Sequence, residues 1–156
     1  MLKTRNRITL NVAVVAVMFV FAALIPSCKK EQPISNVPSI TFNSISPNPA
    51  IKYVDTITIV ISYTDGDGDL GVDSPDVKNM FVTDSRNNVT SSFRIRQLAP
   101  SGSNIAIEGK LDIVLPAQIF VNDNDTTETA TFSVYVVDRA GHKSNMVQTT
   151  PLVINK

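Results

Sequence analysis

The strict alternation of side chains in residues 56–63 constrains the fold of this chain more than any other feature. In this segment, TITIVISY, the apolar residues Ile57, Ile59, Ile61 and Tyr63 occupy every second position. Since successive side chains of a β-strand point to opposite faces, these four lie on one face and the mostly polar remainder lies on the other. The pattern predicts a β-strand with one buried side.

Other segments repeat this period of two. Alternate apolar residues run from 105 to 115, where Gly109 predicts a bulge or a bend, and again from 132 to 137. Turn residues separate the runs, and no segment has the pattern of a convincing amphipathic helix. The remaining predicted strands are residues 39–45, 78–83, 92–98 and 146–154, the last interrupted by Pro151 as in an edge strand or a strand that changes sheets.

About seven short strands in a domain of this length predict an all-β fold, and specifically an immunoglobulin-like β-sandwich. A small barrel or a jelly roll is the alternative architecture. Residues 131–145, TFSVYVVDRAGHKSN, resemble the last hairpin of bacterial Ig-like and PKD-like repeats, in which a strand ends in Asp and a short turn carries Ala-Gly. Here these residues are Asp138, Ala140 and Gly141. The chain lacks the Cys pair and the Trp of antibody-type domains. Their absence excludes an antibody-type domain but not the Ig-like architecture.

The first 27 residues have the plan of a secretory signal. Lys3, Arg5 and Arg7 precede an uncharged and almost wholly apolar run over residues 8–25. A run of this length can also span a bilayer, so an uncleaved transmembrane helix is the alternative interpretation. The residues that follow the run favour the signal peptide.

The end of the apolar run, Ile25-Pro26-Ser27-Cys28, resembles the lipobox of bacterial lipoproteins. The resemblance implies cleavage after Ser27 and attachment of a thioether-linked diacylglycerol to Cys28. Several acyl chains, at about 0.8 kcal/mol per buried CH₂, would anchor the protein permanently. Lys29 follows the cysteine, where an aspartate commonly retains such proteins at the inner membrane. The resemblance therefore implies transport to the outer membrane, and it does not distinguish the periplasmic face from the cell surface.

Together, the leader, the lipobox-like residues and the strand pattern divide the chain into three predicted parts. These are a signal peptide over residues 1–27, a lipid-anchored tether over 28–38 and one Ig-like domain over 39–156. Residues 29–38 are polar and contain two prolines, as in an extended spacer. At roughly 3 Å per residue, the spacer could hold the domain about 30 Å from the membrane.

The densest chemical signal is an acidic, glycine-rich loop directly after the strand that ends at Tyr63. It spans residues 65–76, DGDGDLGVDSPD, and contains no basic residue. Alternate carboxylates on such a loop can converge on Ca²⁺, which takes 6–8 oxygen ligands. The spacing resembles DxDxDG-type calcium loops, and the candidate ligands are Asp65, Asp67, Asp69, Asp73 and Asp76.

Three departures argue against an EF-hand: Leu70 replaces the turn glycine, Asp76 replaces the bidentate Glu, and a strand precedes the loop. A calcium-binding loop between strands remains one interpretation. The other is that the aspartates cap tight turns through Asx hydrogen bonds and keep an exposed loop soluble.

Charge and composition exclude several functions. The leader holds three of the 14 basic residues and none of the 14 acidic ones, so the exported part carries a net charge of about −3, unlike a nucleic-acid-binding protein. Because Cys28 is the only cysteine, the domain has neither an internal disulfide nor a Cys-based zinc site. The only histidine, His142, falls in the predicted hairpin turn, and no P-loop, dinucleotide fingerprint or HExxH occurs. We therefore expect no enzymatic activity.

These observations predict a non-catalytic, lipid-anchored protein of the cell envelope. The expected partners are the membrane, through Cys28, and an envelope protein or a glycan that the residues do not identify. The alternative function is a glycan-binding accessory lipoprotein of a polysaccharide uptake system. Oligomeric state has no signature in the sequence.

Overall fold

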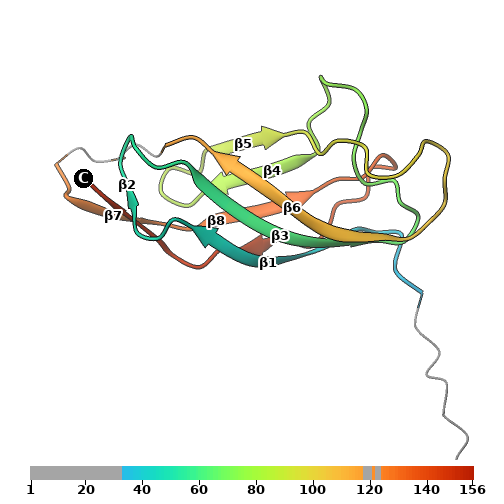
Figure 1. Ribbon diagram of the computed structural model, residues 1–156, viewed down its shortest axis with the longest axis horizontal. Coiled ribbons are helices and arrows are strands. Elements are labelled where there is room, and N and C mark those ends of the chain that lie inside the picture. Colours follow the sequence, from blue (N-terminus) through green and yellow to red (C-terminus); the bar gives the residue numbers. More distant parts are fainter. Residues whose placement is uncertain (1–32, 118–120, 122–123) are drawn as a thin grey trace, which may run out of the picture. The chain divides into compact units, whose positions relative to one another are not determined.

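The alternating segment anticipated from the sequence forms β3 (Ile57–Asp65), the central strand of a three-stranded antiparallel sheet (Figure 1). It pairs with β1 (Ser39–Ser46) on one side and with β6 (Ile107–Leu115) on the other. Every second residue of β3, from Ile57 to Asp65, is buried. The period of two in the sequence is therefore the period of burial, as predicted.

Two further sheets complete the fold. The second has the order β5-β4-β8-β9 and is antiparallel throughout, whereas the third has the order β2-β10-β7, with β10 parallel to β2 and antiparallel to β7. The bounds are β5 (Thr90–Phe93), β4 (Met80–Asp84), β8 (Phe132–Val136) and β9 (Val147–Gln148) for the second sheet, and β2 (Ala50–Ile51), β10 (Leu152–Asn155) and β7 (Thr127–Ala130) for the third.

One hydrophobic core joins the sheets. Its members include Ile59 from β3, Ile113 from β6, Val82 from β4, Val134 from β8 and Ile154 from β10. Since side chains from the inner faces of the first two sheets belong to the same cluster, these sheets pack face to face as a sandwich. The prediction of an all-β, sandwich-like fold is confirmed.

The structure describes residues 33–117, 121 and 124–156. The predicted signal peptide, Cys28 and the first part of the predicted tether lie outside this range, as does part of the connection between β6 and β7. Across the described residues there is no helix, and hence none of the length and hydrophobicity that a bilayer crossing requires.

The strands differ from the sequence prediction in three respects. The described residues form ten strands rather than about seven, because β2 and β7 are too short for a period to be read and the predicted strand 146–154 divides into β9 and β10. The segment 92–98 is in a strand only up to Phe93, since the chain then turns away and forms a single bridge at Arg96. The interruption at Pro151 separates β9 from β10, which belong to different sheets, as expected of a strand that changes sheets.

The predicted bulge or bend at Gly109 is wrong, because β3 and β6 stay in unbroken register past it, with Gly109 opposite Tyr63. A β-carbon at position 109 would lie 2.9 Å from the Tyr63 hydroxyl oxygen and 3.1 Å from its ring. The glycine makes room for the tyrosine ring. Close approach, rather than a break in the ladder, explains a glycine in this strand.

The side chain of Asn145 joins β1 to the segment that precedes β9. Its Oδ1 accepts a hydrogen bond from the Ile40 amide at 2.9 Å, and its Nδ2 donates one to the Ile40 carbonyl at 2.8 Å. Asn145→Ala should lower the free energy of unfolding by about 2 kcal/mol, because both backbone groups of the buried Ile40 lose a partner. Urea unfolding checks this value. Asn43→Ala is the control, because the exposed Asn43 exchanges hydrogen bonds with the Ser62 side chain and with no buried backbone group. An equal loss in both variants would contradict the prediction.

Candidate functional site

The acidic loop begins inside the sheet. Asp65 is the last residue of β3 and continues the inward-facing series of Ile61 and Tyr63, so its side chain is 0 % exposed. Its Oδ2 accepts a hydrogen bond of 2.7 Å from the Leu70 amide, which closes the loop. The Leu70 side chain is itself fully buried in the core. The leucine that breaks the EF-hand pattern is therefore the apolar anchor of this loop.

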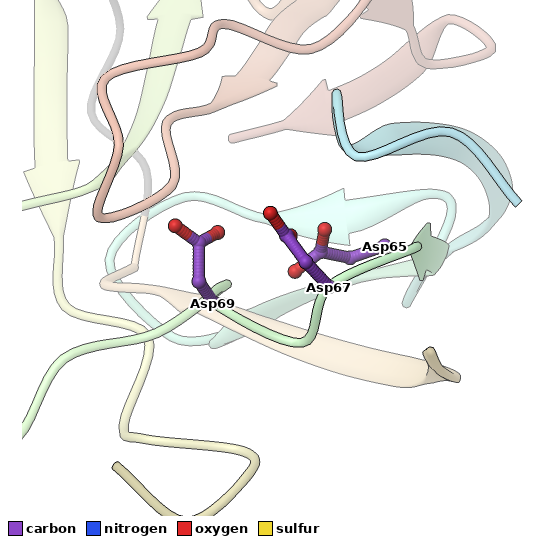
Figure 2. Close-up of side chains that lie close together, drawn as sticks. All are labelled: Asp65, Asp67 and Asp69. Carbon is purple, nitrogen blue, oxygen red and sulfur yellow. The ribbon is translucent and has the colours of Figure 1, made fainter. Parts of the chain in front are cut away.

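Three of the five candidate ligands meet in this loop. Figure 2 shows the side chains of Asp65, Asp67 and Asp69 on the same side of the backbone. One carboxylate oxygen from each residue lies within 4.8 Å of the corresponding oxygens of the other two. The loop thus gathers three carboxylates within the span of a single coordination sphere.

Each of these carboxylates also has one oxygen without a partner. The Oδ1 atoms of Asp65, Asp67 and Asp69 are buried and accept no hydrogen bond from any described residue. A buried acceptor that has lost water and gained nothing costs about 1–3 kcal/mol, and more when it is charged. Turn amides occupy other oxygens, such as Asp65 Oδ2, so capping of tight turns leaves these three atoms unexplained.

The electrostatics of the loop oppose ionisation. Burial raises the pKa of Asp65 above its ordinary value of 3.8, and the neighbouring carboxyl groups of Asp67 and Asp69 raise it further, against the lowering effect of the Leu70 amide. The pKa of Asp69 is also raised, by burial first and then by the negative charges of Asp138 and Asp67, although the Ala140 amide and Arg139 lower it. A cation would reverse both effects by stabilising the ionised forms.

The hairpin over residues 138–142 holds the other side of the loop. The backbone amide of Ala140 donates to Asp69 Oδ2 at 3.0 Å. The guanidinium of Arg139 donates to the carbonyl oxygens of Gly71 at 2.9 Å and Gly68 at 3.4 Å. These bonds position the glycine-rich backbone and leave the inner carboxylate oxygens unoccupied.

The buried Asp138 organises the hairpin itself. Its Oδ1 accepts a hydrogen bond from the His142 amide at 2.7 Å, and its Oδ2 lies 2.9 Å from His142 Nδ1. A carboxylate that accepts the amides of its own turn is the arrangement expected from the sequence of this hairpin. Both Asp138 oxygens are thus engaged, and the residue contributes charge to the site without a free ligand atom.

The remaining candidates lie elsewhere. Asp73 and Asp76 are exposed and do not belong to the group formed by Asp65, Asp67 and Asp69. The Asp73 carbonyl oxygen instead accepts a hydrogen bond from Arg94 at 3.0 Å. The chain leaves the loop after Leu70 has entered the core, so the later aspartates are carried away from the first three. The predicted lipidation site, Cys28, lies outside the described residues.

The oxygen spacing is compatible with Ca²⁺. Two ligands of one ion are separated by at most twice the metal–oxygen distance, which is about 5 Å for Ca²⁺. The three carboxylate oxygens lie within 4.8 Å of one another, which is inside this limit. Three monodentate carboxylates fill at most half of a calcium shell, so backbone carbonyls and water would supply the other ligands.

Comparisons with protein-family models, with curated proteins and with solved structures found no match to this chain.

The sequence identified the acidic loop and the hairpin separately but not the contact between them. Asp69 and Ala140 are 71 residues apart, and β3 and β8 belong to different sheets. No local period predicts which loops meet at one end of a sandwich. The only available signal was that each motif directly follows a strand.

Proposed function

We propose that this chain is a non-catalytic, lipid-anchored protein of the bacterial cell envelope, and that its Ig-like domain is an interaction module stabilised by one Ca²⁺. The observation that carries the calcium part is the set of three buried carboxylate oxygens without partners, on Asp65, Asp67 and Asp69. The lipobox-like end of the leader, with Cys28, supports the anchor. The proposed location is the outer membrane.

Direct titration tests the calcium site. The full-length protein, purified in detergent and freed of metal with a chelator, should bind one Ca²⁺ with a dissociation constant of about 10⁻⁴ to 10⁻³ M, the range of extracellular calcium modules. Asp67→Asn should remove the heat of binding, whereas Asp73→Asn should leave it intact because Asp73 is exposed and outside the group. Absence of binding at millimolar Ca²⁺ would contradict the proposal, and equal loss in the two variants would contradict this choice of ligands.

Replacement of the lipidation residue tests the anchor. Cys28→Ser should abolish labelling by a radioactive or clickable fatty acid and should release the protein from the membrane fraction, because no other anchor is proposed. Ser27→Ala is the matched control, since alanine is also small and keeps the thiol. Mass spectrometry that finds an unmodified thiol at Cys28 or an intact first methionine in the wild-type protein would overturn this part of the proposal.

The aromatic side chains support a protein partner over a glycan. Sugars stack on exposed rings, but among the described aromatic residues only Tyr53 is exposed. Phe81 and Tyr135 stack on each other with centroids 4.8 Å apart, and the Lys143 ammonium lies 3.7 Å from the Tyr135 centroid. Cross-linking in intact cells should therefore recover an envelope protein. Binding on a glycan array that is lost on Tyr53→Ala, which removes the exposed ring, would favour the accessory role in polysaccharide uptake instead.

A further inference from the structure

The last residues of the tether lie against the acidic loop. The amide of Gly66, which stands between Asp65 and Asp67, donates a 2.8 Å hydrogen bond to the carbonyl oxygen of Ser35. The Ser35 hydroxyl in turn accepts one from the Val37 amide at 3.0 Å. The compact unit begins at Pro33, so these residues belong to it. In Figure 1 this segment leaves the domain at the end opposite β2, β7 and the C-terminus.

Gly66 is packed too closely against the tether to carry a side chain. A β-carbon there would lie 2.3 Å from the Ile34 carbonyl oxygen and 2.7 Å from the carbonyl carbon and oxygen of Ser35. Gly66 is not among the glycines with positive φ. Contact with the tether, rather than backbone conformation, therefore accounts for a glycine at this position.

The same peptide segment serves both contacts. Asp65 and Asp67 would each provide a ligand to the cation, and the residue between them holds the tether. Without a cation, three carboxylates whose oxygens lie within 4.8 Å of one another repel each other, which favours a more open loop. A more open loop would move the Gly66 amide away from the Ser35 carbonyl.

We propose that calcium binding at Asp65, Asp67 and Asp69 fixes the tether to the domain through Gly66, and so controls how rigidly the domain is held relative to its lipid anchor. This inference rests on the proposed calcium site. In the calcium-bound form, residues 34–37 are docked on the loop. In the calcium-free form residues 34–37 are released from the loop, which lengthens the segment between the domain and Cys28. Coupling of this kind is reciprocal, so a docked tether also strengthens calcium binding.

Hydrogen exchange read by mass spectrometry tests this coupling in the full-length protein in detergent, with calcium or with chelator. Exchange in a peptide covering residues 33–38, whose hydrogen-bonded amide is that of Val37, should slow by at least about fivefold with calcium, the lower end of the range for coupled sites. Exchange of the Gly66 amide, which donates to Ser35, should slow with it. Asp67→Asn should exchange at the calcium-free rate under both conditions. A peptide covering residues 147–155 is the internal control and should not change.

Gly66→Ala separates the tether from the metal. It should leave the tether in rapid exchange even with calcium and should weaken calcium binding by about the factor by which calcium slows the tether. Gly102→Ala is the control for a glycine replacement away from the tether, because a β-carbon there meets no atom within 4 Å. Its φ of 77° strains an alanine, so this control should lose stability but keep the calcium affinity and the slow tether exchange of the wild type. If Gly66→Ala does not fold, the comparison of wild type with Asp67→Asn decides.

The outcomes separate the two proposals. Measurable calcium binding with unchanged exchange at residues 33–38 would overturn the coupling and leave the calcium site standing. Failure to bind calcium in the titration would overturn both. Slower exchange with calcium in the wild type, together with no slowing by calcium in Asp67→Asn, would support the coupling.

Discussion

Asp65→Asn is expected to stabilise the metal-free protein at pH 7 and to remove the stabilisation that calcium supplies. The side chain is 0 % exposed, its pKa is raised chiefly by burial, and its Oδ1 has no partner among the described residues. Asparagine has the same shape and keeps an oxygen for the Leu70 amide. Its amide group is neutral and can donate to the unpartnered oxygen of Asp67. The substitution thus removes a buried charge without creating a cavity.

The calcium response should change in the opposite direction. A ligand that binds only the folded state at 100 times its dissociation constant stabilises that state by about 2.7 kcal/mol. For a domain of this size, the unfolding temperature of the wild type should rise by about 10 °C. The variant lacks one of the three carboxylates, so its unfolding temperature should hardly change. Thermal unfolding with calcium and with chelator measures both values.

The difference in stability between the metal-free wild type and Asp65→Asn should depend on pH. Since the pKa of Asp65 is raised in the folded state, its contribution to stability is fully present below the ordinary value of 3.8 and is lost as the pH rises through the raised value. The metal-free wild type should therefore gain stability relative to Asp65→Asn as the pH falls from 7 towards about 4. Asp112→Asn, which changes an exposed carboxylate on β6, is the charge-matched control. A variant that is less stable without metal yet still responds to calcium would refute this account.

Leu70→Ala should be the most destabilising single change in the loop. The leucine is fully buried and belongs to the hydrophobic core, although it lies among five aspartates in the sequence. Truncation of a buried leucine costs about 2–5 kcal/mol, because the lost burial is compounded by a cavity. We expect about 3 kcal/mol in urea unfolding.

The same variant should weaken calcium binding. The Leu70 amide holds Asp65 Oδ2 at 2.7 Å, so movement of this residue displaces a proposed ligand. Val77→Ala is the control, because Val77 is 45 % exposed and lies in the connection that follows the loop. Its stability should stay within about 0.5 kcal/mol of wild type. Similar losses in the two variants would indicate that Leu70 is not an anchor of the loop.

The strands could be predicted where burial imposes a period on the sequence. The alternation at Ile57, Ile59, Ile61 and Tyr63 reappears as alternating burial, and it extends one step further to Asp65. That step explains why the first aspartate of the loop is buried. The period of two wrongly predicted a strand over residues 92–98. Two apolar residues beyond β5 pack on the core from a loop instead: Ile95 is buried and Leu98 is partly buried. The period also missed β7, because its sequence, TETA, has no alternation of apolar residues.

The candidate site could be predicted in part. The spacing of aspartates and glycines identified the loop, and three of its five aspartates come together. The sequence did not distinguish these three from Asp73 and Asp76, because the difference arises where Leu70 enters the core. The contacts of Ser35 and Ala140 with the loop join residues about 30 and 70 positions away, and no neighbouring residue encodes them.

The sequence by itself determined the all-β class, the buried face of the central strand and the acidic loop at that strand's end, because each is a local pattern of side chains. The lipid anchor stays a prediction from such a pattern. Only the tertiary structure decided which carboxylates face one another, which of their oxygens lack partners, and which distant segments close around them. The physical reason is that strand pairing and the burial of one core bring these segments together, and such long-range contacts leave no period along the chain.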